Sequence, residues 1–151
     1  MNNNNYNITT VQESTGLCPG WISGFIDSDG SFSVNLARST TTALGYTVSL
    51  SFTLTQHLNN LELFNLFPVY FGTGSVFCSR ERLVYYKMGE MHTFETQLFP
   101  LLEAHPLMTQ KRLDYADFKR VCAMVKRREH LTPNGLNQIC LIKEGMNRGR
   151  Y

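Results

Sequence analysis

Long apolar runs are missing from this sequence of 151 residues, and so are other features that would assign it to a common class. No stretch approaches the roughly 20 consecutive apolar residues that a membrane-spanning helix needs. The first ten residues, MNNNNYNITT, contain neither the apolar core of a secretion signal nor the arginines of a transit peptide. We therefore expect no membrane partner, a disordered lead-in over residues 1–15, and a single domain over 16–151.

Cysteine-based and loop-based metal motifs are also missing. The four cysteines are widely spaced and include no CxxC pair, so neither a zinc site nor a redox motif is visible. The Asp-x-Asp-Gly run at 27–30 lacks the later acidic residue that an EF-hand loop requires. With 42% hydrophobic and 17% charged residues, the chain has the composition of one folded domain.

Basic residues are scarce in the first half of the chain. Arg38 is the only lysine or arginine before residue 80, and the other thirteen lie from Arg80 onward. Although the net charge is only +2, this asymmetry hints at a polyanionic partner. A basic run such as 126–128 is equally usual on a solvated helix face, so charge alone leaves the partner open.

Hydrophobic periodicity predicts an α+β domain. Strict alternation at 31–38 and 46–56 predicts two strands, and 74–88 predicts a second hairpin with its tip at 80–82. Helical periodicity predicts helices at 20–28, 58–71, 90–103 and 109–128, and a last one opening at Thr132 and Pro133. This order favours an antiparallel sheet with helices packed on one face.

The run GWISGFIDSDG (20–30) combines features that an ordinary core helix avoids. Gly20 and Gly24 lie one helical turn apart with Ser23 and Asp27 nearby, and small residues at this spacing let two helices approach closely. We therefore predict that this face packs against a second copy.

Asp29 would then lie near its symmetry mate. Juxtaposed carboxylates repel unless they share a proton or a cation, and Mg²⁺ binds carboxylate, phosphate and water oxygens. The arrangement predicts a metal site at a symmetric interface, with a phosphodiester as substrate. The alternative is that Asp27 and Asp29 only close a helix-to-strand turn, for which Asp-x-Asp-Gly is common chemistry.

Residues 22–30, ISGFIDSDG, resemble the nine-residue signature of the LAGLIDADG homing endonucleases. The runs PLMTQKRLDYADFK (106–119) and HLTPNGLNQICLIKEGMNRG (130–149) also resemble this family, so the resemblance covers residues 17–149. It implies the αββαββα fold of the family and site-specific cleavage of a long pseudo-palindromic site in double-stranded DNA, as in intron homing. Because the chain holds one motif, it implies a homodimer through the motif helix, with interface residues Gly20, Ser23, Gly24 and Asp27.

The resemblance also implies catalytic residues. Asp29 would be the metal-binding catalytic carboxylate, Ser28 would offer its backbone carbonyl to the metal, and Asp27 would hydrogen-bond at the helix end. Gln56 would orient water, and Lys111 would be the basic residue near the scissile phosphate. The metal would be Mg²⁺, with Mn²⁺ as a substitute and Ca²⁺ supporting binding without cleavage. Alternatively, Gln56 caps its strand and Lys111 is an ordinary first-turn lysine.

Small hydroxyl residues line the outward face of the predicted sheet, where they permit close approach of another surface. A plain solvated face is the alternative. The resemblance implies that this face enters the major groove of DNA, which admits a β-ribbon. The predicted DNA-binding residues are Ser33, Asn35, Arg38, Thr47, Ser49, Ser51, Thr53, Ser75, Phe77, Ser79, Arg80, Arg82, Tyr85 and Lys87. Few are Arg or Gln, which suggests reliance on water and DNA shape.

Three alternatives stay open at this point. The chain could be an intron maturase that assists RNA splicing, or a non-catalytic DNA-binding protein on the same scaffold. It could also be one half of a two-motif protein, although the Asn-rich start favours a complete chain. The resemblance further suggests an organellar location, in a mitochondrion or chloroplast.

Overall fold

The computed structural model describes residues 13–151. Most of the predicted disordered lead-in, residues 1–12, lies outside the described residues. Residues 13–15 are helical, so the prediction of disorder is wrong for them.

The elements follow the predicted order. The motif helix α2 (Pro19–Asp29) leads directly into β1 (Gly30–Arg38), which turns into β2 (Tyr46–His57). After the next helices, β3 (Ser75–Cys78) and β4 (Leu83–Met88) form the second hairpin. The remaining helical segments are η1 (Leu58–Asn60), α3 (Leu61–Phe64), α4 (Phe67–Phe71), α5 (Met91–Thr93), η2 (Phe94–Leu98), α6 (Phe99–Ala104), α7 (Lys111–Lys126), η3 (Glu129–Leu131), α8 (Pro133–Glu144) and η4 (Asn147–Arg150).

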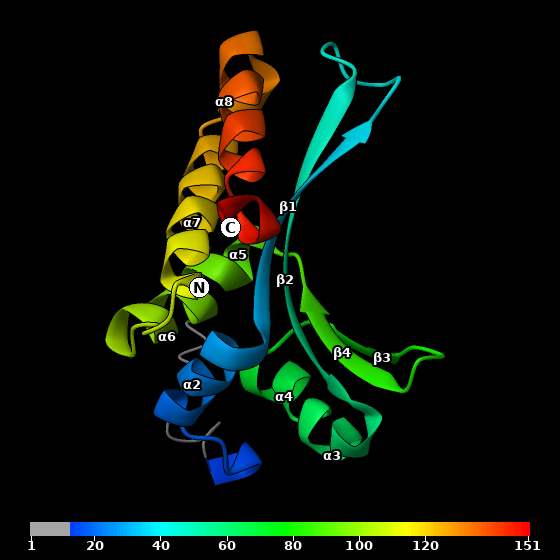
Figure 1. Ribbon diagram of the computed structural model, residues 1–151, viewed down its shortest axis with the longest axis vertical. Helices are drawn as coiled ribbons and strands as arrows, with labels where there is room; N and C mark the ends of the chain where they lie inside the picture. Colours follow the sequence, from blue (N-terminus) through cyan, green and yellow to red (C-terminus); the bar gives the residue numbers. More distant parts are fainter. Residues whose placement is uncertain (1–12) are drawn as a thin grey trace, which may run out of the picture.

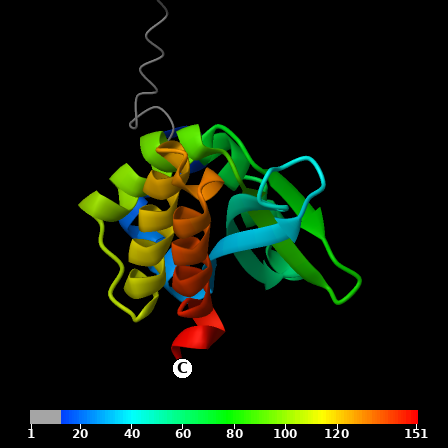
Figure 2. The same ribbon diagram turned by 90° about the horizontal axis from the view of Figure 1, so that it is seen from above.

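The four strands form one antiparallel sheet in the order β1-β2-β4-β3. The β1–β2 hairpin and the β3–β4 hairpin extend in different directions, so the sheet leaves an open, concave side (Figure 1). The helices α2, α6, α7 and α8 gather on the opposite side, as the view from above also shows (Figure 2). The predicted α+β fold with helices on one face is confirmed.

Alternation along β1 and β2 builds the core. Phe32 on β1 and Phe52 on β2 are register partners, both fully buried, with ring centroids 5.3 Å apart. Phe118 of α7 packs on Phe32 at 5.4 Å and fixes this helix against the sheet. Burial of each such side chain contributes about 2 kcal/mol or more to stability, so the core sets the position of α7 relative to β1.

Two predicted helices are irregular. The predicted helix at 58–71 is three short pieces, because Pro68 restarts the helix after Asn65 and Leu66, and Gly72 ends it with a φ of 74°. The helix at 90–103 contains a π-helical segment at Phe94–Leu98. The last helix begins as predicted, since the Thr132 hydroxyl accepts the amide of Gly135 and Pro133 occupies the first turn.

Within residues 13–151, the helices are too short or too polar to cross a membrane.

Candidate functional site

The end of the motif helix brings a carboxylate, backbone carbonyls and a lysine together. The helix α2 ends at Asp29, and Gly30 opens β1 directly after it. The ammonium of Lys111, in the first turn of α7, donates to the carbonyl oxygens of Ser28 at 3.0 Å and of Ile26 at 3.2 Å. The carbonyls at a helix C-terminus carry partial negative charge, so this end of α2 attracts a cation.

The charge of Lys111 is held among oppositely charged groups. Burial acts to lower the pKa of Lys111, while the carboxylates of Asp27, Asp29 and Asp114 act to raise it, and the net pKa is lowered. The structure therefore places Lys111, which the family resemblance assigned to the scissile phosphate, beside the predicted metal ligands Ser28 and Asp29.

Asp27 ties the end of α2 to the loop before α7. Its carboxylate accepts the amide of Met108 at 2.8 Å, the amide of Thr109 at 3.1 Å and the Thr109 hydroxyl at 2.5 Å. Partial burial acts to raise the pKa of Asp27, but these hydrogen bonds and the charge of Lys111 lower it overall. Asp27 thus holds the segment that delivers Lys111, so its carboxylate is engaged within its own chain and does not offer a free contact to a partner.

Gln56 lies at the end of β2 on the side of the sheet that Leu54 occupies by alternation. Its side-chain oxygen accepts the amide of His57 at 3.0 Å and the amide nitrogen of Asn60 at 3.4 Å. In this structure Gln56 therefore closes the turn after the strand. Because Leu54 pairs with Gly30, Gln56 is also two residues from the strand position that faces the end of α2.

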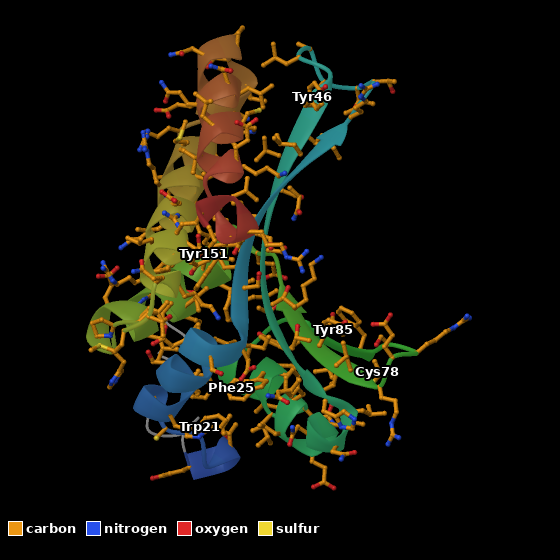
Figure 3. The ribbon with its side chains drawn as sticks, in the orientation of Figure 1. Trp21, Phe25, Tyr46, Cys78, Tyr85 and Tyr151 are labelled. Carbon is orange, nitrogen blue, oxygen red and sulfur yellow. The ribbon has the colours of Figure 1, made fainter. Side chains whose placement is uncertain are left out.

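The motif helix leaves one stripe of small residues exposed. Gly20 and Gly24 are exposed, and a Cβ added at Gly24 would meet no atom within 4 Å. Trp21 beside them is 43% exposed and stacks on Phe25, with ring centroids 5.2 Å apart (Figure 3).

Ser23 corrects the predicted interface. Its side chain is buried, and its hydroxyl donates to the carbonyl of His105 at 2.5 Å. Position 23 lies 60° around the helix from position 20, on the inward stripe that includes Ile22 and Ile26. Ser23 therefore serves the internal packing of α2 against the end of α6, and the prediction that it faces a second copy is wrong.

The sheet register places most of the predicted reading residues in rows on one face. Thr53 pairs with Ser31 and Lys87, Lys87 pairs with Ser75, and Tyr85 pairs with both Thr55 and Phe77. The remaining pairs along β1 and β2 on this face are Ser33 with Ser51, Asn35 with Ser49, and Ala37 with Thr47. Tyr86 points to the opposite side, where it is fully buried and donates to the Thr73 carbonyl.

Two predicted reading residues do not fit an accessible outward face. Ser51 is only 6% exposed and lies within 3.4 Å of the side-chain amide of Asn35, so the prediction of an exposed side chain is wrong. Arg38 ends β1 and has the same parity as Phe32, Val34 and Leu36, so it belongs to the core side of the sheet and the prediction that it faces outward is wrong. Ser79, Arg80 and Arg82 lie in the β3–β4 turn, where both arginines are exposed.

The C-terminal segment adds basic residues that sequence reasoning missed. A shallow hollow of about 430 Å³ is lined on one side by Ser31, Ser33 and Asn35 of β1 and on the other by Lys143 and Arg148. The segment is fastened by Asn147, whose amide nitrogen donates to the Phe32 carbonyl at 2.9 Å. Arg150 continues the attachment through Asp114 and Asp117 on α7. The only sequence signal was the abundance of basic residues late in the chain.

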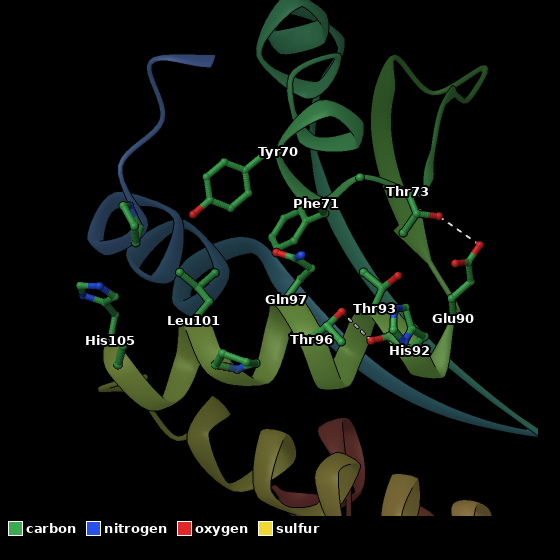
Figure 4. Close-up of a pocket in the computed structure, with 14 residues that line it drawn as sticks. Tyr70, Phe71, Thr73, Glu90, His92, Thr93, Thr96, Gln97, Leu101 and His105 are labelled. Atoms are coloured by element: carbon green, nitrogen blue, oxygen red, sulfur yellow. Dashed lines mark hydrogen bonds between the residues drawn. The ribbon is translucent and has the colours of Figure 1, made fainter. Parts of the chain in front are cut away.

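A deeper cavity, of about 650 Å³, lies between α4, the helices α5 to α6 and the start of α2 (Figure 4). It contains none of the predicted site residues. Two of the polar side chains that line it form hydrogen bonds to neighbouring residues of the lining. The Thr73 hydroxyl donates to Glu90 at 3.0 Å, and the Thr96 hydroxyl donates to the His92 carbonyl at 2.8 Å.

The residues at the end of α2 fit a divalent metal ion that is shared with other ligands. Within the described part of the chain, no group of three or more His, Cys, Asp or Glu side chains could hold a metal alone. Mg²⁺ commonly takes one or two carboxylates and completes its shell with phosphate oxygens and water. Asp29 and the Ser28 carbonyl supply that kind of partial set, and the Ser28 oxygen already accepts a hydrogen bond from the Lys111 ammonium.

These features define an α+β domain with a polar sheet face and, at the end of the motif helix, an acid and a lysine. The chain belongs to the LAGLIDADG endonuclease family, whose model matches residues 22–122. It is 39% identical over 132 residues to "Probable intron-encoded endonuclease 3" of Neurospora crassa, covering 85% of this chain but only 25% of that protein. The chain thus spans about a quarter of this relative.

Solved structures agree in fold and differ in length. The homing endonuclease I-TnaI is 32% identical with a TM-score of 0.82, and the match covers 87% of this chain and 88% of I-TnaI. I-SmaMI, solved on an uncleaved DNA target in the presence of calcium ions, is 30% identical with a TM-score of 0.82. That match covers 86% of this chain but 45% of the I-SmaMI chain, so this chain corresponds to about half of I-SmaMI.

Proposed function

We propose that this chain is a site-specific DNA endonuclease that cuts both strands of a long pseudo-palindromic target as a homodimer, by divalent-metal-dependent hydrolysis. The observation that carries the proposal is the meeting of Lys111 with the Ser28 carbonyl beside Asp29, at one end of a polar sheet face. The DNA-bound relative I-SmaMI and the family supply the substrate class.

Two copies are proposed because one copy supplies one acidic site and one reading face. The exposed stripe of Gly20 and Gly24 offers a helix surface on which a second α2 can pack closely. The match covers 45% of the I-SmaMI chain, so two copies of this chain correspond in length to one I-SmaMI chain, which supports a pair. The match covers 88% of the I-TnaI chain, which is therefore close to this chain in length. A two-fold dimer places one Asp29 near each strand to be cut.

Each residue at the site has a proposed task. Asp29 and the Ser28 carbonyl would hold Mg²⁺, or Mn²⁺ in its place, and the bound ion supplies Lewis acidity that favours an attacking hydroxide. The Ser28 oxygen has two lone pairs, so it can accept the Lys111 hydrogen bond and still bind a cation. Lys111 would stabilise negative charge on the phosphate, and Gln56 would orient the attacking water. Asp27 would keep Lys111 in place through residues 108 and 109.

The outward face would read the major groove. Ser33, Asn35, Ser49, Thr53 and Lys87 offer donors and acceptors to base edges. Further proposed contacts come from Thr47, Ser75, Phe77, Ser79, Arg80, Arg82 and Tyr85. Lys143 and Arg148, beside β1, would contact backbone phosphates. The intron-encoded N. crassa relative supports an intron as the proposed source. An organellar location of that intron, in a mitochondrion or chloroplast, is proposed from the family resemblance.

A cleavage selection on a randomised DNA duplex library with Mg²⁺ tests the proposal. We expect the wild type to enrich one pseudo-palindromic site of about 20 base pairs, cut in both strands. Asp29→Asn keeps the size of the side chain but removes its charge, so we expect the cleavage rate to fall by about 10³-fold or more. The variant should still bind the enriched site in Ca²⁺.

Three outcomes would contradict the proposal. Equal cleavage by wild type and Asp29→Asn would show that Asp29 is not catalytic. Enrichment by binding in Ca²⁺ without any cleavage in Mg²⁺ would indicate a non-catalytic DNA-binding protein. An unchanged library in both experiments, together with binding to intron RNA, would indicate a maturase.

A further inference from the structure

Two aromatic rings stand together on the otherwise polar outward face. Phe77 of β3 and Tyr85 of β4 are register partners, and their rings stack with centroids 5.0 Å apart and planes 10° apart. Phe77 is 47% exposed. On this face Tyr85 also pairs with Thr55 of β2, and Ser75 and Lys87 form the next pair along β3 and β4. The phenyl ring is therefore held in one orientation and presented to the concave side.

A phenyl ring at this place selects what it can touch. It offers no hydrogen-bond donor or acceptor, so a polar group buried against it would lose its hydration without compensation. Base edges in the major groove are donors and acceptors, with one apolar exception, the C5-methyl group of thymine. Contact with that methyl group removes apolar surface from water on both partners.

We propose that Phe77, oriented by its stack on Tyr85, contacts a thymine methyl group in each half-site and determines specificity at that base pair. This inference rests on the proposed function and names the base that one part of the reading face selects. Tyr85 is a positioning residue in this arrangement. Its hydroxyl stays available for hydrogen bonding at the edge of the same contact.

The register also fixes where the thymine should lie. Asp29 immediately precedes Gly30 of β1, which pairs with Leu54 of β2. Thr55, which follows Leu54, pairs with Tyr85 of β4, and Tyr85 pairs with Phe77 of β3. Phe77 is therefore about three strand spacings of 4.8 Å, or about 14 Å, from the proposed catalytic end. At 3.4 Å per base pair this is about four base pairs. The thymine is expected within about six base pairs of each cut.

Single replacement of each thymine of the selected target by deoxyuridine tests the contact, since uracil differs only by the missing methyl group. Equilibrium binding of wild type is measured in Ca²⁺. We expect uracil at one position of a half-site to weaken binding about fourfold, and uracil at both symmetric positions to weaken it about fifteenfold. Phe77→Ser should lose this sensitivity, whereas Phe77→Leu should retain most of it. Val69→Ser, at an exposed apolar residue of α4, is the matched control.

The inference is overturned if wild type binds every uracil-substituted target like the thymine target, or if Phe77→Ser keeps the full sensitivity. A target without thymine within six base pairs of the cuts would also overturn it. In these cases a selected, cleaved site still supports the proposed function. If wild type selects no DNA, the proposed function fails and the inference fails with it. The uracil series on wild type decides the contact even if Phe77→Ser does not fold.

Discussion

The ammonium of Lys111 lies 3.0 Å from the carbonyl oxygen of Ser28, across 83 residues of sequence. This hydrogen bond joins the first turn of α7 to the last turn of the motif helix. It places a fixed positive charge next to Asp29, and burial together with three nearby carboxylates sets the pKa of Lys111. The charge arrangement at the proposed cleavage site is therefore built by tertiary packing of α7 on α2.

Replacing Lys111 by Met tests whether this charge acts on the reacting phosphate. We expect the single-turnover cleavage rate to fall by about 10²-fold, because a positioned charge acts most strongly on the transition state. Binding in Ca²⁺ should change by less than about threefold. Lys126→Met, at the other end of α7, is the control and should cut like the wild type. Equal losses in binding and cleavage would assign Lys111 to general phosphate binding instead.

Asp27→Asn tests the connection between α2 and the loop before α7. The carboxylate accepts two backbone amides and a hydroxyl, and an amide side chain would face those donors with one of its own. We expect the free energy of unfolding in urea to fall by about 1–3 kcal/mol. Glu62→Gln, at an exposed residue of α3, should change it by less than about 0.5 kcal/mol. A loss no greater than that of the control would mean that these hydrogen bonds do not hold the loop.

Arg148→Gln tests the proposed phosphate contact of the C-terminal segment. Each phosphate contact that is lost should reduce the slope of log Kobs against log salt by about 0.9, so a dimer with two such arginines should lose about 1.8. Binding should weaken to a similar extent for all sequences. Arg112→Gln, at an exposed position in the first turn of α7, is a comparison of equal charge change. If Arg148→Gln instead changes the preferred bases, the residue reads sequence and the phosphate assignment is wrong.

The strands could be predicted because alternation is a local property. On β2, the sequence alone separates Phe52 and Leu54, which are buried, from Thr53 on the outward face. Parity also placed Tyr85 outward, and the structure buries Tyr86 instead. Such predictions need only the two-residue period of a strand and one apolar side to define the inside.

The site features that the sequence did not predict correctly depend on contacts between distant segments. Spacing puts Ser23 near Gly20 and Gly24, but its side chain is buried and its hydroxyl donates to the carbonyl of His105, 82 residues away. Alternation predicts Ser51 outward correctly, yet it is buried despite that direction. The role of Lys143 and Arg148 beside β1 follows from the docking of the C-terminal segment, which no local period encodes.

Gly24→Leu tests the proposed homodimer without disturbing the fold of one chain. A Cβ at position 24 meets nothing within 4 Å, and leucine is a better helix former than glycine by up to about 1 kcal/mol. We expect the melting temperature of the monomer to stay equal or rise. A leucine on this stripe keeps two α2 helices apart, so we expect the dimer dissociation constant to rise at least about tenfold by sedimentation equilibrium.

Trp21 supplies a second readout of the same interface, because it is the single tryptophan and is 43% exposed on the adjacent stripe. In a dimer through α2 its emission should shift to shorter wavelength with rising concentration, and Gly24→Leu should move that transition to higher concentration. Ala116→Leu adds a similar side chain to an exposed position of α7 and should leave the transition unchanged. If Gly24→Leu dimerises like the wild type while Ala116→Leu does not, the copies pair through α7 and the motif helix is not the interface.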